Sequence, residues 1–183
     1  DEYKTRRVEE ALAAVGFGRL TMDGVARRAR AGKAALYRRW PSKQEMVLEV
    51  VTNISVPMAE TAPTEDLADD VARLVHGVAD WLADARMSRI IPDLIAEAMR
   101  NPELAAALTE RLGSARRNYG QAVIDAAIAR GEVSPDVDSE YVLDLIAAPV
   151  FWRTCGRREQ TTPAYLDRVV GTVLRELGAD AAQ

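Results

Sequence analysis

Apolar residues recur every three to four positions along most of the chain, which is the spacing expected of amphipathic helices. At the amino end, Val8, Leu12 and Val15 make such a stripe, and Gly16 follows as a residue suited to ending a helix. Alanine is abundant while phenylalanine and tyrosine are scarce, which favours close approaches between helices. The sequence therefore predicts an all-α chain of about nine helices, over residues 3–15, 22–29, 33–40, 46–54, 66–86, 90–99, 103–130, 139–155 and 163–177.

Capping residues mark where several of these helices begin. Thr21 is a suitable N-cap for the second helix, because its hydroxyl can accept a hydrogen bond from a free backbone N–H. Ser42 has the same role before the fourth helix, with Glu45 at the capping-box position. Asn101 and Pro102 fit the N-cap and first position of the helix at 103–130.

A break in the helical pattern and a change in charge divide the chain. Residues 55–64 interrupt the pattern with two prolines, so we predict two domains, residues 1–54 and residues 55–183. The first 54 residues hold eleven Lys and Arg against seven Asp and Glu, whereas the whole chain holds 24 against 28. A basic head on an acidic body is the arrangement that a DNA-binding protein needs, because repulsion keeps the body off the duplex.

The stretch from Thr21 to Lys43 reads as two short helices joined by a tight turn. It contains seven basic residues and one acidic residue, Asp23, on a chain whose net charge is −4. The small residues Ala34 and Ala35 would let the second helix approach another molecule closely. The flanking Lys and Arg side chains would then contact phosphates, as in a helix-turn-helix. Charge alone leaves a second interpretation open, an ordinary solvated pair of basic helices.

The remaining composition bounds the class of protein. No apolar run approaches the ~20 residues that span a bilayer, and the charged amino end has no secretory pattern, so we expect no membrane association. A lone cysteine, Cys155, forbids an internal disulfide and fits the cytoplasm. One histidine, one cysteine and no carboxylate pair, phosphate loop or metal-ligand spacing argue against an enzyme, a cofactor or a metal. Because the chain lacks an initial Met, we expect a few residues before Asp1 to be missing.

The order LTM-GVA-RA--GKAALYRRWPSK resembles the DNA-binding domain of the TetR/AcrR family of transcriptional regulators over about residues 5–52. The resemblance implies a three-helix helix-turn-helix domain, a linker helix and a helical domain for ligand binding and dimerisation. The family usually has glycine in the turn where this chain has Arg30. Either Arg30 adopts a left-handed conformation at a cost of about 1–2 kcal/mol, or Gly32 takes the strain.

The resemblance also assigns roles in DNA binding. Tyr37 and Lys43 match positions that hold phosphate, and Thr21 can offer its hydroxyl to the backbone. Lys33, Arg38 and Arg39 are candidates for base edges, because Arg or Lys to guanine is the commonest specific contact. For Arg38 and Arg39 a phosphate contact or a free surface charge is an equal alternative. The predicted DNA-binding set is Thr21, Lys33, Ala34, Ala35, Tyr37, Arg38, Arg39 and Lys43.

The last two helices carry more apolar surface than one buried stripe requires. The surplus indicates either a second buried face or helices wrapped on all sides by the core. In similar regulators these helices pair with their symmetry mates in a four-helix bundle, and a two-fold protein suits a palindromic operator. The predicted dimer residues are Val142, Ile146, Leu166, Val169, Val170 and Val173.

The resemblance further implies an effector cavity among the middle helices. Apolar core and apolar pocket look alike in a sequence, so each candidate can also be a core residue. Their mostly apolar character favours a lipophilic or aromatic small molecule. The predicted lining is Trp81, Met87, Met99, Asn118, Tyr119, Phe151 and Trp152.

We therefore predict a cytoplasmic transcriptional repressor that binds a palindromic operator in double-stranded DNA as a homodimer. A small apolar or aromatic effector would release it. The alternative is a helical DNA-binding or scaffold protein that responds to no effector. A melting screen separates the two, because a ligand that binds only the folded state raises the melting temperature.

Overall fold

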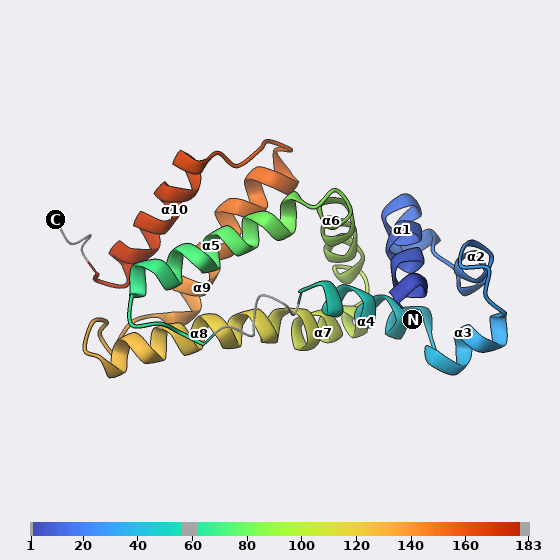
Figure 1. The fold of residues 1–183 in the computed structure, drawn as a ribbon, viewed down its shortest axis with the longest axis horizontal. Helices are drawn as coiled ribbons and strands as arrows, with labels where there is room; N and C mark the ends of the chain where they lie inside the picture. Colours follow the sequence, from blue (N-terminus) through green and yellow to red (C-terminus); the bar gives the residue numbers. More distant parts are fainter. Residues whose placement is uncertain (1, 56–61, 180–183) are drawn as a thin grey trace. The chain divides into compact units, whose positions relative to one another are not determined.

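The computed structural model describes residues 2–55 and 62–179, and within these residues it is built of α-helices without a strand (Figure 1). The all-α prediction is confirmed. The described residues form ten α-helices where about nine were expected, because a π-helical segment, Thr109–Gly113, divides the predicted helix at 103–130. A second π-helical segment, Trp152–Gly156, follows α9. The helices are α1 Glu2–Arg19, α2 Met22–Arg28, α3 Lys33–Arg39, α4 Lys43–Ser55, α5 Leu67–Ala83, α6 Met87–Ala98, α7 Pro102–Leu108, α8 Ser114–Ala129, α9 Ser139–Phe151 and α10 Pro163–Glu176.

The helices form two compact units that are discontinuous in sequence. The first contains α1–α4 with α6 and α7, and the second contains α5 and α8–α10. In the first unit α6 packs on α1, which places part of the predicted body against the basic head. The division into functional domains at residues 54 and 55 stays a prediction.

Predicted caps begin α2 and α7. The Thr21 hydroxyl accepts the Gly24 N–H at 3.1 Å. Asn101 Oδ1 likewise accepts the Leu104 N–H at 3.1 Å, with Pro102 in the first turn. Each bond satisfies one of the backbone donors that a helix start leaves free.

The capping box at α4 is only half formed. Ser42 Oγ accepts the Glu45 N–H at 3.1 Å, as predicted. The Glu45 carboxylate, however, accepts from Arg111 at 2.8 Å. In a complete capping box the Glu45 side chain would accept a hydrogen bond from the Ser42 N–H. Here it forms an ion pair with Arg111 within the first unit instead.

Gly16 ends the regular part of α1. Its backbone has φ 75 and ψ 164, which is not helical, although a short turn continues the element to Arg19. Immediately after it, the Phe17 N–H donates to Asp93 Oδ2 of α6 at 2.6 Å, and the Phe17 ring is buried. The Phe17 carbonyl accepts Lys43 Nζ at 2.9 Å. The predicted break and the core role of Phe17 are confirmed.

The core of the second unit lies among α5, α9 and α10, which lie side by side (Figure 1). Val75, Val142 and Val173 have no exposed surface. Asp70 is the buried charge of α5, only 1% exposed, and it accepts the Thr64 N–H and pairs with Arg73. The carboxylate is therefore compensated, as a buried charge must be.

This core accounts for most of the apolar surplus on the last two helices. Because their side chains are already buried within the chain, five of the six predicted dimer residues offer little surface to a partner. Val170 alone is half-buried. The buried five are Val142, Ile146, Leu166, Val169 and Val173.

Candidate nucleic-acid interface

Helices α2 and α3 are held together by apolar side chains on their inner faces. Val25 of α2 has no exposed surface, and Leu36 of α3 and Trp40 after it are each 1% exposed. Leu36 and Trp40 are four residues apart, so they lie on the same side of α3. This leaves the opposite side of α3 for solvent.

The turn between the helices is built around Arg30, whose φ of 49 lies in the left-handed region. Gly32 instead has φ −65 and ψ 136, an extended conformation that any residue adopts. Of the two alternatives, the structure therefore has the one in which Arg30 carries the strain, about 1–2 kcal/mol for a residue with a Cβ.

We expect Arg30→Gly to raise the free energy of unfolding by about 0.5–1 kcal/mol, because glycine removes the left-handed penalty but adds freedom to the unfolded chain. Urea unfolding measures the change. Arg6→Gly is the matched control, since Arg6 is an exposed residue inside α1, where glycine costs about 1 kcal/mol. A less stable Arg30→Gly would contradict the left-handed turn.

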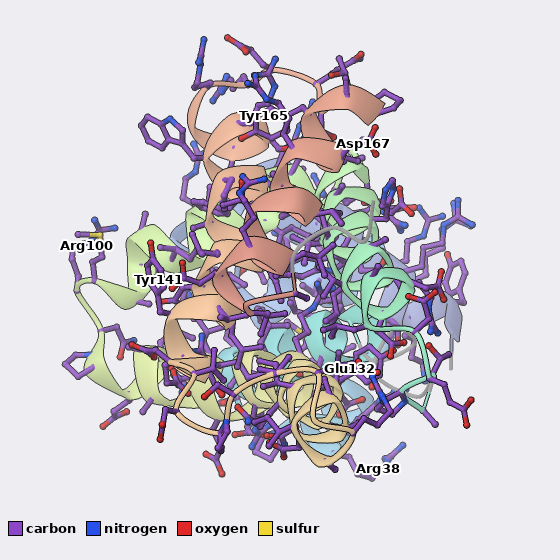
Figure 2. The ribbon with its side chains drawn as sticks, turned by 90° about the vertical axis from the view of Figure 1, so that its left-hand side faces the viewer. Arg38, Arg100, Glu132, Tyr141, Tyr165 and Asp167 are labelled. Atoms are coloured by element: carbon purple, nitrogen blue, oxygen red, sulfur yellow. The ribbon has the colours of Figure 1, made fainter. Side chains whose placement is uncertain are left out.

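The exposed face of α3 carries Lys33, Ala34, Tyr37 and Arg38. Tyr37 is 43% exposed, and Arg38 extends away from the ribbon (Figure 2). Ala35 is half-buried, and Thr21 is exposed as well as capping α2. The structure thus brings five of the eight predicted DNA-binding residues to the surface of the hairpin.

Lys33 is the most constrained of these exposed groups. Its ammonium lies 2.9 Å from the Asp23 carboxylate and 6.0 Å from the centre of the Tyr37 ring. The hydrogen bond to Asp23 raises the pKa of Lys33. Since both partners are more than half exposed, the pair is weak in water and can yield to a phosphate or a base.

Arg39 and Lys43 are placed differently from Arg38. The Arg39 guanidinium lies 3.0 Å from Glu49 of α4 and 4.5 Å from the centre of the Trp40 ring. Lys43 Nζ bonds the Phe17 carbonyl and lies 4.3 Å from the centre of the Phe17 ring. Both side chains are half-buried and connect helices of the first unit.

The hairpin is strongly positive at its surface. Besides Lys33 and Arg38, the exposed basic residues are Arg27, Arg28 and Arg30. Asp23 is the only acidic residue between positions 21 and 43. Such a cluster attracts phosphates and raises the rate of encounter with a polyanion. Chemically, the surface can bind nucleic acid.

The predicted pocket residues fall in both units and differ in exposure. Met87 is buried at the start of α6, and Met99 at the end of the same helix is 84% exposed. In the second unit, Trp81, Tyr119 and Phe151 are half-buried, Asn118 is exposed and Trp152 is 64% exposed. Trp81 and Tyr119 are therefore the members with both partial burial and a polar group.

Sequence reasoning missed three contacts between distant residues. Asp93 accepts the Phe17 N–H, and Glu9, which is buried, pairs with Arg86. Arg116 of α8 lies over the ring of Trp81 of α5, 3.9 Å from its centre. Partners this far apart leave no periodic signal in a sequence, because only the tertiary fold brings them together.

Two negative findings apply to the described residues. No group of three or more His, Cys, Asp or Glu side chains among them is placed to hold a metal ion. No helix in residues 2–55 or 62–179 is long and apolar enough to cross a membrane.

Two family models match the chain. Residues 9–50 match the model described as "Bacterial regulatory proteins, tetR family". Residues 61–173 match "Tetracyclin repressor-like, C-terminal domain". The first match includes the whole basic hairpin.

Individual proteins are similar over most of the chain. An uncharacterized HTH-type transcriptional regulator of Mycobacterium tuberculosis, Rv1556, is 34% identical over 143 residues, which are 76% of this chain and 68% of that protein. A protein of Mycobacteroides abscessus named "DNA-binding transcriptional repressor TetR" is 29% identical, over 90% of this chain and 86% of its own. Among solved structures, Salmonella enterica GusR has a TM-score of 0.76 at 20% identity, over 96% of this chain and 95% of that one, which is a likeness of fold.

Proposed function

Because the chain belongs to the TetR family of bacterial transcriptional regulators, we propose that it represses transcription by binding a palindromic operator as a homodimer, and that a small-molecule effector releases it. The family consists of DNA-binding regulators, so the chain is not an enzyme. A cytoplasmic location is part of the proposal, because the operator is there.

The exposed face of α3 is the observation that carries the proposal. A recognition helix needs small and basic side chains on one side and a packed core on the other. Ala34 and Arg38 are exposed, while Leu36 is buried. This arrangement supports insertion of α3 into the major groove.

We assign the contacts by exposure. Arg38 and Lys33 read base edges, since their side chains stand clear of the core or are held only by the exposed Asp23. Tyr37 and Thr21 bond the DNA backbone, and Ala34 and Ala35 allow close approach. Arg39 and Lys43 remain candidates for phosphate contacts. Each is also held by a bond within the first unit, Arg39 by Glu49 and Lys43 by the Phe17 carbonyl.

The dimer contact is proposed on the exposed face of α9. Tyr141, Leu145 and Ala148 recur at intervals of three and four residues and so share one side of that helix, and Trp152 follows four residues later as the first residue of the π-helical segment after α9. Tyr141 is 50% exposed and projects from α9 (Figure 2). Large exposed aromatic residues are the kind that anchor interfaces. Val170 of α10 is the member of the original set that remains available.

Arg38 provides the test of the DNA-binding surface. We expect Arg38→Ala to relax the preference at one operator position and to cost about 1–3 kcal/mol of binding free energy there. The DNA flanking the coding region supplies the operator, located as an inverted repeat and confirmed by footprinting. Fluorescence anisotropy with singly substituted operators then measures the preference.

Two variants control this experiment. Arg39→Ala should alter affinity without changing base preference, because its guanidinium is engaged with Glu49. Arg100→Ala removes an exposed arginine at the end of α6 and should leave binding unchanged (Figure 2). Unchanged preference in Arg38→Ala would remove it from the base-reading set, and failure to bind any flanking repeat would contradict the proposed function.

A further inference from the structure

Phe17 is held through both polar groups of its backbone. Its N–H donates to Asp93 Oδ2 of α6 at 2.6 Å, and its carbonyl accepts Lys43 Nζ of α4 at 2.9 Å. The same ammonium lies 4.3 Å from the centre of the Phe17 ring, which is buried. Three helices of the first unit, α1, α4 and α6, therefore meet at one residue.

Phe17 orients the Lys43 ammonium without neutralising it. Unlike Lys33 and Arg39, Lys43 forms no ion pair with a carboxylate of residues 2–55 or 62–179. An ammonium has three N–H donors, and the Phe17 carbonyl takes one of them. A carbonyl and an aromatic face fix the position of the ammonium but leave its positive charge for a further partner. Lys43, the first residue of α4, is therefore both oriented and charged, as a phosphate contact requires.

The Asp93 carboxylate is used to hold the Phe17 backbone. No Lys or Arg side chain in the described part of the chain forms an ion pair with Asp93. The carboxylate lies close to the turn, because a β-carbon on Gly16 would lie 2.7 Å from Asp93 Oδ1. A hydrogen bond to a carboxylate is about twice as strong as one between neutral groups. Asp93 therefore fixes where the carbonyl and the ring of Phe17 lie at the end of α1.

We propose that Asp93 is a positioning residue for DNA binding: it holds Phe17, and Phe17 holds the Lys43 ammonium in place for a phosphate. The inference rests on the proposed function, in which Lys43 is a candidate for a phosphate contact. It makes DNA binding depend on a residue of α6, which lies in the stretch 61–173 that matches the C-terminal family model. Asp93 itself does not touch the DNA.

The sign of the effect distinguishes positioning from simple electrostatics. Asp93 is a negative charge in the unit that carries the basic hairpin, and DNA is a polyanion. If only charge matters, removing this carboxylate should strengthen DNA binding. If Asp93 positions Lys43, removing the carboxylate should weaken DNA binding instead.

Asp93→Ala, Lys43→Gln and the double variant test the proposal in the full chain. Fluorescence anisotropy measures the affinity for a DNA duplex of random sequence between about 50 and 200 mM salt. Lys43→Gln should make the slope of log K against log salt shallower by about 0.9 for each bound DNA-binding domain, since one phosphate contact is lost. Asp93→Ala should make the slope shallower too, and weaken binding about fivefold at low salt. The double variant should bind as Lys43→Gln does, because Asp93 acts through Lys43.

Two further variants on α6 are matched controls. Asp93→Asn keeps an oxygen that can accept the Phe17 N–H, so it should restore most of the affinity and the slope. Glu97→Ala removes a carboxylate one helical turn later, where it pairs with Arg100 at 3.2 Å, and should not weaken DNA binding. Circular dichroism and urea unfolding establish that each variant is folded under the binding conditions. If Asp93→Ala does not fold, Asp93→Ser, whose side chain is shorter than that of Asp93, takes its place.

Several results would overturn the proposal: an Asp93→Ala protein that binds DNA as tightly as the wild type or more tightly, effects of the two substitutions that simply add, or an unchanged slope in Lys43→Gln. A less stable Asp93→Ala protein with an unchanged slope would give Asp93 a structural role only. Operator binding is measured separately. Absence of operator binding would refute the proposed function while the random-sequence duplex still tested Asp93 and Lys43, and binding to neither DNA would overturn both proposals.

Discussion

Replacing Gly16 with alanine should lower the free energy of unfolding by about 3 kcal/mol. The backbone at Gly16, with φ 75 and ψ 164, lies in a region that essentially only glycine occupies, and strain of this kind costs about 1–3 kcal/mol. A β-carbon there would also lie 2.7 Å from Asp93 Oδ1. Asp93 would have to move, and its charged hydrogen bond to the Phe17 N–H would weaken by about 1–2 kcal/mol.

Gly18→Ala is the control for this variant. Gly18 lies two residues later, has no positive φ, and a β-carbon there would meet only Glu97 at an ordinary 3.7 Å. Urea unfolding monitored by circular dichroism should show Gly18→Ala within about 0.5 kcal/mol of the wild type. Equal stability of the two alanine variants would contradict the strained junction between α1 and α6.

Periodicity and capping chemistry were sufficient to predict most helices, because both are local. Thr21 and Asn101 begin helices since their side-chain oxygens reach backbone donors three residues on. The interruption between α7 and α8 escaped the same reasoning because its apolar spacing is continuous. There the Thr109 hydroxyl donates to the Ala105 carbonyl at 3.0 Å, and the Ser114 hydroxyl donates to the Glu110 carbonyl. Such bonds compete with the helical ladder and bend it.

The candidate DNA surface was predicted as a region but not residue by residue. Arg38 and Arg39 are adjacent and chemically identical, yet only Arg39 meets Glu49 ten residues later. The distinction depends on where α4 lies relative to α3, which no local pattern encodes. Lys43 is a similar case, since its bond to the Phe17 carbonyl depends on the turn at Gly16.

The wide apolar stripes of the last two helices could not distinguish a dimer face from a helix surrounded by the core of its own chain. A helix that contacts two neighbours in its own core needs as much apolar surface as one that contacts a neighbour and a partner chain. In the structure α9 and α10 each pack on the other and on α5. We therefore place the proposed dimer contact at exposed aromatic residues, because the valines are already buried within the chain.

Trp152→Asp should convert the proposed dimer into a monomer and weaken binding to the proposed operator by about 100-fold or more. Trp152 is 64% exposed, and a β-carbon added at Gly156 would lie 2.5 Å from its ring, so the ring lies where only glycine leaves room for it. An exposed tryptophan can bury a large apolar area at an interface, and a carboxylate there would be buried without a partner. A monomer has one DNA-binding domain and cannot bind two half-sites at once. Simultaneous binding raises the affinity by about 10²–10⁴-fold, and this gain is lost.

Sedimentation velocity gives the oligomeric state, and fluorescence anisotropy gives the operator affinity of the same samples. Met99→Asp is the matched control, because Met99 is 84% exposed and is not among the residues proposed for the contact, so the charge should leave the oligomeric state unchanged. A Trp152→Asp protein that remains dimeric would exclude this face of α9 as the contact. If that dimer also kept its operator affinity, the half-buried Val170 on α10 would become the next position to substitute.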